Sequence, residues 1–217
     1  MVTQSRRSAL PLPTAEYHAR VAQVRSRLPS QIEGEARFDT FTRGRYATDA
    51  SIYQIMPAGV VFPKSAADVE AALRIAAENG ISVILRGAGT SQNGQPLAAG
   101  LVLDCSRHLN TLVHYDPAAL EAVVEPGMVL ERLNARLRAD GLFFPIEPST
   151  ATRCTLGGMT SNNSCGARSL RYGKMVDNVL AVRGWLADGQ PFEFSSAAIA
   201  GAAGGATGSA RAQELAQ

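Results

Sequence analysis

Cysteine is scarce in this chain of 217 residues, and so are the patterns that would make cysteine structural. The three cysteines, Cys105, Cys154 and Cys165, are odd in number and form no C-x-x-C pair. No histidine stands at zinc-binding spacing from them. These absences argue against a disulfide framework and against a metal site, so we expect buried, reduced thiols.

Charge and long apolar runs are also limited. Charged residues make up 18% of the chain with a formal net charge of +2, which predicts no nucleic-acid partner. The sequence has no apolar run long enough to span a membrane, and the arginine pair Arg6 and Arg7 is not followed by the apolar region of a signal peptide. We therefore expect no transmembrane segment and a location in the cytoplasm or at the inner face of the membrane.

Apolar residues account for 46% of the chain, enough to bury the core of one full-sized domain or two small ones. Residues 1–45 are interpreted as an N-terminal arm that carries a helix with a basic face at 14–28. Residues 46–194 form the expected folded domain. Residues 195–217 are rich in alanine and glycine and are interpreted as a tail or linker.

A βαβ-like unit is predicted between residues 60 and 90. An apolar run precedes Ser65, a good helix N-cap, and Asp68 follows in the first turn of the predicted helix. Asn79 and Gly80 mark its end, and a second apolar run then leads into a glycine loop. The apolar face of this helix consists of Val69, Ala72, Leu73, Ala76 and Ala77.

Further elements complete a mixed fold. A second amphipathic helix is predicted at 129–139, with Leu130, Leu133 and Leu137 facing inward and Gly141 as its stop. Strands are predicted at 101–104, 111–115, 121–125, 179–187 and 191–194, the last two joined at Asp188-Gly189. These elements indicate an α+β or α/β domain.

The glycine loop, "ILRGAGTSQNGQ" at 84–95, has the character of a phosphate-binding loop without either common phosphate motif. Gln95 and Pro96 stand where a Walker loop needs Lys and Ser or Thr, and Gln92 replaces the third glycine of the dinucleotide fingerprint. Two interpretations remain open. The backbone N–H groups and the hydroxyls of Thr90 and Ser91 bind a pyrophosphate, or the loop is a tight turn with a polar tip.

Two later segments have the same composition of small residues, hydroxyls and amides: "EPG" at 125–127 and "TLGGMTSNNSCG" at 155–166. Three such segments in one chain favour a ligand with many oxygens and one large apolar ring. The sequence does not favour a reactive cysteine, a basic substrate site or aromatic stacking on the ligand. We expect Cys165 to be a packed residue, the basic group Arg168, Arg171 and Lys174 to face water, and Phe143, Phe144 and Trp185 to lie in the core.

Five ordered blocks, "FPKSAADVEAAL", "LRGAGTSQNG", "VEPG", "PSTATRCTLGG" and "SNNSCGARSLRYGKMVDNVLAV", resemble the FAD-binding domain of the vanillyl-alcohol oxidase type, also called the PCMH-type fold. The resemblance covers about residues 53–187. It implies an α+β fold of two small α+β subdomains with FAD extended between them. It also assigns 46–194 to this domain and implies that the fold is C-terminally incomplete.

The resemblance also implies which residues hold FAD. The pyrophosphate would lie against residues 87–91, and Gly127 would let the chain pass close to the nucleotide. Residues of 149–155 would supply further hydroxyls, and residues of 157–166 would line the cofactor where it turns toward the flavin ring. The full implied set is Arg86, Gly87, Ala88, Gly89, Thr90, Ser91, Gln92, Gly127, Ser149, Thr150, Thr152, Thr155, Gly157, Gly158, Asn162, Asn163 and Gly166. Relatives with covalent FAD carry histidine where Thr90 stands, so noncovalent FAD is implied here.

Within the family the sequence is most similar to flavoprotein dehydrogenases of D-2-hydroxy acids such as D-lactate, D-2-hydroxyglutarate and glycolate. "RYATDASIYQIMP" and "SCGARSLRYGK" resemble the large bacterial members that append an iron–sulfur domain. The implied partners are a small 2-hydroxy acid and an electron acceptor outside this chain; no catalytic residue is assigned. Two alternatives remain: a flavin-binding module or subunit without its own catalysis, and an NADPH-dependent reductase of the cell-wall amino-sugar type.

Overall fold

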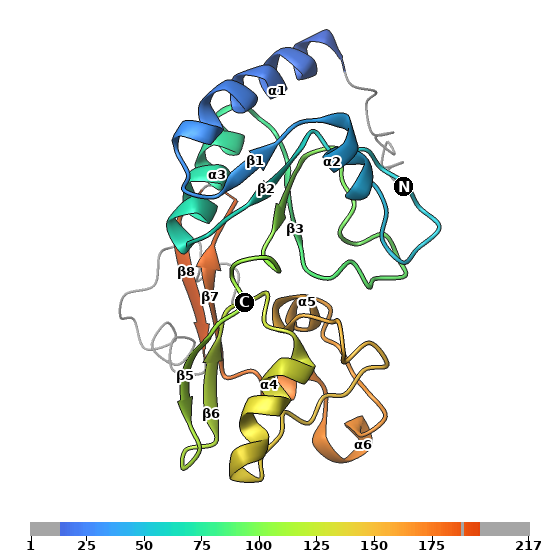
Figure 1. Ribbon diagram of the computed structural model, residues 1–217, viewed down its shortest axis with the longest axis vertical. Helices are drawn as coiled ribbons and strands as arrows, with labels where there is room; N and C mark the ends of the chain where they lie inside the picture. Colours follow the sequence, from blue (N-terminus) through green and yellow to red (C-terminus); the bar gives the residue numbers. More distant parts are fainter. Residues whose placement is uncertain (1–13, 188, 196–217) are drawn as a thin grey trace, which may run out of the picture.

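The computed structural model describes residues 14–187 and 189–195, and it arranges them as two subdomains (Figure 1). The first subdomain is drawn above and the second below. The first contains α1 (Ala15–Arg27), η1 (Leu28–Ser30), β1 (Glu35–Arg37), α2 (Thr40–Arg45), β2 (Gly59–Phe62), α3 (Ala66–Glu78), β3 (Val83–Arg86) and β4 (Leu101–Asp104). The mixture of helices and sheets confirms the α+β class.

The sheet of the first subdomain has four strands in the order β1-β2-β4-β3. Strand β1 is antiparallel to β2, whereas β2, β4 and β3 are parallel to one another. The predicted βαβ unit is present, but β4 lies between its two strands. All residues of β2 and β4 are buried, because α3 and α1 pack on this sheet.

Helix α3 forms as its sequence predicts. The Ser65 hydroxyl accepts the Asp68 backbone N–H, and Gly80 follows the C-cap Asn79 with a φ of +61°. Asp68 does more than complement the helix dipole, since its buried carboxylate also accepts the backbone N–H groups of Glu33, Gly34 and Lys64 at 2.8–2.9 Å. This carboxylate therefore ties the chain before β1 to the start of α3.

The segment expected as an N-terminal arm contributes to the first core from residue 14 onward. Val24 and Leu28 are fully buried against α3 and the sheet, and β1 adds a strand beside β2. Strand β1 and helix α2 were not predicted from the sequence. The expectations for residues 1–13 and for the tail at 196–217 lie outside the described residues.

The second subdomain is built around α4 (Leu130–Leu137). Leu130, Leu133 and Leu137 are buried, as predicted, and Gly141 ends the helical segment with a φ of +70°. The remaining elements are β5 (Leu112–Asp116), β6 (Glu121–Val124), η2 (Arg138–Asp140), α5 (Leu156–Ser161), α6 (Ser169–Tyr172) and α7 (Met175–Asn178). A second apolar cluster, separate from that of the first sheet, forms around α4 and α5.

The predicted C-terminal hairpin is present as β7 (Ala181–Trp185) and β8 (Pro191–Ser195), which pair antiparallel. Gly189 N–H donates to the Leu186 carbonyl in the turn; Asp188 lies outside the described residues. Val179, just before β7, packs on the second cluster, whereas Trp185 at its end packs on the first. Strand β7 therefore connects the two cores, and Trp185 is a packing residue as expected.

Candidate functional site

The glycine loop begins where β3 ends at Arg86, on the side of the first subdomain that faces the second. Gly89 and Gly94 have φ values of +68° and +71°, which glycine adopts without strain. Within the described part of the chain, none of the backbone N–H groups of residues 87–92 donates a hydrogen bond. Consecutive free backbone donors are the feature of an anion-binding loop.

The loop lies directly on the first turn of α5. A Cβ at Gly87 would stand 2.2 Å from the Thr155 Oγ1, so only glycine fits at this position. Farther along the loop, Gln95 Nε2 donates to Asn162 Oδ1 at 2.7 Å. Figure 1 shows α5 at the top of the second subdomain, next to the first. The structure thus brings two of the three glycine segments together at the junction of the subdomains.

The glycines of the second subdomain lie against other parts of the chain. A Cβ at Gly127 would stand 2.1 Å from the Cys105 carbonyl oxygen, and one at Gly166 would stand 2.2 Å from that of Glu147. Gly157 packs on Pro126 and donates its N–H to the Pro126 carbonyl at 2.9 Å. Close contact between chain segments therefore accounts for these glycines, and their role toward a cofactor stays a prediction.

The hydroxyls of the implied set differ in availability. Thr155 is buried, and its Oγ1 accepts the Gly158 N–H as the N-cap of α5. Ser91 Oγ donates to Gln95 Oε1 at 2.7 Å and accepts the Asn93 N–H. Among the described residues the Thr90 hydroxyl has no hydrogen-bond partner and is half-buried in the loop.

The remaining implied residues lie on the second subdomain. Ser149, Thr152 and Gly158 are exposed, and Thr150 is half-buried. The two amides are already engaged: Asn162 with Gln95, and Asn163 with the Val176 N–H at 3.0 Å. Asn163 also has a φ of +43°, so its amide supports a left-handed turn.

The sequence did not indicate what lies beneath the loop. The Arg86 guanidinium carbon lies 5.4 Å from the centre of the Tyr46 ring, and the Tyr46 hydroxyl donates to Asp104 Oδ2. Burial and the bond to this carboxylate raise the pKa of Tyr46, which stays protonated. The one sequence signal was Asp104 itself, a charged residue at the end of the buried strand β4.

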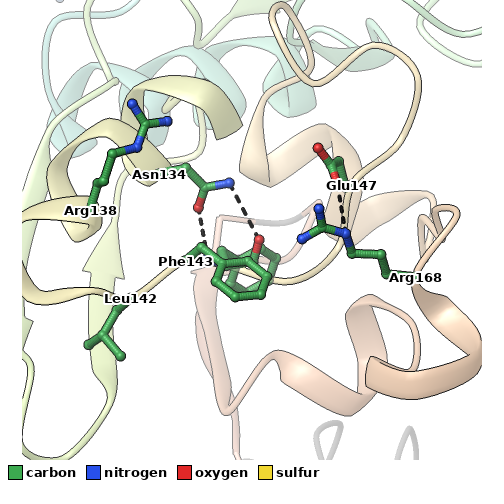
Figure 2. A pocket seen from close by; sticks show the side chains of 7 residues that line it. Asn134, Arg138, Leu142, Phe143, Glu147 and Arg168 are labelled. Carbon is green, nitrogen blue, oxygen red and sulfur yellow. Dashed lines mark hydrogen bonds and ion pairs between the residues drawn. The ribbon is translucent and has the colours of Figure 1, made fainter.

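A separate hollow of about 180 Å³ lies on the second subdomain (Figure 2). Asn134, Arg138, Phe143 and Arg168 are among its lining residues, and none of the implied cofactor residues lines it. The expectation that Phe143 lies in the core is wrong: its side chain is 44% exposed, and Arg168 covers its ring at 5.5 Å. Arg168 also pairs with Glu147 at 3.2 Å.

All three cysteines are free thiols, as predicted, but only two of them are buried. Cys105 and Cys154 are buried free thiols, and burial raises the pKa of Cys105 to about 12. Cys165 is exposed, so the expectation of a packed residue is wrong, because the 163–168 turn points it outward. The described residues contain no cluster of three metal-ligating side chains, and none of their helices is long and apolar enough to cross a bilayer.

A protein-family model described as an FAD binding domain matches residues 57–195. The chain belongs to this family. In this FAD-binding domain the glycine loop has unpaired backbone N–H groups and lies against the start of α5. The cofactor implied by the sequence is thereby confirmed.

Curated relatives of this FAD-binding domain are much longer. D-2-hydroxyglutarate dehydrogenase of Escherichia coli strain K12 is 44% identical over 146 residues, which are 66% of this chain and 14% of the relative. Glycolate oxidase subunit GlcD of Bacillus subtilis strain 168 is 35% identical over 164 residues, which are 73% of this chain and 35% of the relative. The chain thus spans a minor part of the proteins it matches.

Solved structures share the fold. Glucooligosaccharide oxidase from Acremonium strictum superposes with a TM-score of 0.70 at 18% identity, covering 83% of this chain and 38% of that one. At this sequence identity the structural similarity supports a shared fold only. It confirms the PCMH-type α+β architecture that the sequence blocks implied.

Proposed function

We propose that the chain holds FAD noncovalently at the junction between loop 86–92 and segment 149–166, as the FAD-binding portion of a D-2-hydroxy-acid dehydrogenase. One observation supports this proposed position of the cofactor: the N–H groups of residues 87–92 are unpaired, and their loop lies against Thr155 at the start of α5. The names of the matched relatives, D-2-hydroxyglutarate dehydrogenase and glycolate oxidase subunit, support the substrate class.

The chain's own residues bind and orient the cofactor. The N–H groups of 87–92 donate to pyrophosphate oxygens, and the free Thr90 hydroxyl adds a further donor. When bound, FAD supplies the acceptor for the hydride that leaves Cα of the hydroxy acid, while a base takes the hydroxyl proton.

Thr90 decides how FAD is held. A threonine hydroxyl forms no histidyl bond to the flavin, so the cofactor is bound only by noncovalent contacts. The chain is loaded with FAD, desalted and precipitated with acid. We expect the yellow colour to remain in the supernatant; colour that stays with the pellet would contradict noncovalent binding.

The substrate class is tested on the flavin-loaded chain and on the longer protein that contains it. D-2-Hydroxyglutarate and D-lactate are added without oxygen, with the L-enantiomers as controls. We expect the flavin absorbance to bleach with a D-enantiomer only. Bleaching by NADPH in place of hydroxy acids would instead favour the reductase alternative.

A further inference from the structure

The guanidinium of Arg86 has no direct ion-pair partner among the described residues. Its Nη1 is buried without a hydrogen-bond partner, and no carboxylate of the described residues lies within ion-pair distance. Two carboxylates lie in this part of the structure: Asp104 accepts from Tyr46 and from the Ser106 N–H, and Asp49 accepts the Ser51 N–H while its Oδ2 is buried without a partner. A buried N–H group without a hydrogen-bond partner lowers the stability of a folded chain.

This charge lies immediately beneath the glycine loop. A Cβ at Gly89 would stand 2.4 Å from Arg86 Nη2, so the guanidinium rests against the Gly89 Cα. The Tyr46 ring also lies against the guanidinium, at 5.4 Å from its carbon. Because Tyr46 is hydrogen-bonded to Asp104, which pairs with Arg86 in the β3–β4 register, the guanidinium is held in place.

We propose that Arg86 is a positioning residue that acts through Gly89: its charge, which has no direct ion-pair partner, lies behind the free N–H groups of 87–92 and strengthens their attraction for a pyrophosphate on the opposite side of the loop. The proposal rests on the proposed function. In a buried, weakly polar setting a charge acts over several ångströms without direct contact. Tyr46 contributes by holding the guanidinium under the loop through a cation–π contact.

The proposal requires two properties to change in opposite directions. Arg86→Met keeps most of the apolar stem and removes the charge. The melting temperature of the FAD-free variant is expected to equal or exceed that of the wild type, because a buried N–H group without a hydrogen-bond partner is lost. Its dissociation constant for FAD is expected to rise at least tenfold. A purely structural arginine would instead lower the melting temperature.

Two conservative variants separate charge from shape. Arg86→Lys restores a positive charge on a flexible stem, and its FAD affinity is expected to lie between those of the wild type and Arg86→Met. Tyr46→Phe keeps the ring over the guanidinium and is expected to weaken FAD binding less than threefold. Tyr46→Leu removes the ring and is expected to weaken binding more than Tyr46→Phe does.

The test is a fluorescence titration with FAD, together with thermal unfolding of the FAD-free protein, for the wild type, Arg86→Met and Arg86→Lys. Affinities in the order wild type, Lys, Met, with no fall in melting temperature for Met, support the proposal. Equal affinity of wild type and Met, equal affinity of Lys and Met, or a lowered melting temperature for Met overturns it. If the wild type itself binds no FAD, the proposed function fails first.

Discussion

Gly89 and Gly127 stand in similar glycine motifs but lie in different surroundings. Around Gly89 the backbone N–H groups are free and the chain adopts a positive φ. Gly127 instead donates its N–H to the Leu109 carbonyl, and its Cα lies against carbonyl oxygens of residues 105 and 109. A glycine-rich motif therefore has two physical causes, ligand access and close chain packing, which differ in whether the backbone donors are already used.

The largest effect is expected from Gly127→Ala. Its Cβ would stand 2.1 Å from a backbone oxygen that has little room to move. We expect a loss of about 3 kcal/mol or more in the free energy of unfolding, measured by chemical denaturation. Gly44→Ala, with nothing within 4 Å, is the control and is expected to change stability by less than about 1 kcal/mol. A similarly small loss in the free energy of unfolding for Gly127→Ala would show that close chain packing does not explain this glycine.

Gly89→Ala tests whether the glycine loop gives a ligand access to the backbone N–H groups. Alanine at a φ of +68° costs about 1–2 kcal/mol, and its Cβ would stand 2.4 Å from the Arg86 Nη2. We expect a moderate loss of stability but at least a tenfold loss of FAD affinity, because the free N–H groups are displaced. Unchanged FAD binding in a folded Gly89→Ala protein would show that the loop is only a turn.

The contact between Gln95 and Asn162 links the two regions directly. Its bond of 2.7 Å joins two exposed side chains, so its contribution is small. A double-mutant cycle with Gln95→Ala and Asn162→Ala is expected to give a coupling energy of about 0.5–1 kcal/mol. A coupling energy of zero would show that this bond does not hold the loop on the second subdomain.

The smallest effect on stability is expected from alkylation of Cys165. It is exposed, whereas burial holds the pKa of Cys105 at about 12 and raises that of Cys154. At pH 8 iodoacetamide should label Cys165 in the native chain, and the other two only after unfolding; mass spectrometry checks this. The folded state keeps Cys105 protonated, so its contribution to stability is lost as the pH rises from about 9 toward 12. Native labelling of Cys105 would contradict its burial.

The elements that the sequence predicted correctly are those with local signals. Helices α3 and α4 carry their own caps and apolar faces, and the strands at their flanks are apolar runs. Strand β1 has three residues and helix α2 has six, which are too few to show a hydrophobic period. Strand β1 forms because it pairs with β2 at the edge of the sheet. The position of β4 between β2 and β3 is likewise set by tertiary packing, which no local sequence pattern predicts.

The sequence predicted the glycine loop of the candidate site but not the contacts that lie beneath that loop. The spacing of Gly87, Gly89 and Thr90 indicates an anion-binding loop, yet the contact of Arg86 with Tyr46 joins residues 40 positions apart and leaves no local trace. Residue type also led to wrong predictions at Phe143 and Cys165, which are apolar residues in exposed segments without regular secondary structure. Burial depends on which partner covers a residue, and sequence spacing does not show that.

Backbone amide hydrogen exchange of the chain with and without FAD tests the central claim most directly. The N–H groups of 87–92 are unpaired and should exchange fast without cofactor, whereas those of Gly127 and Gly157 are already bonded to carbonyl oxygens. We predict that FAD slows exchange in peptides that cover 87–92 far more than in those that cover 125–130. Binding of FAD without protection of 87–92 would contradict the account.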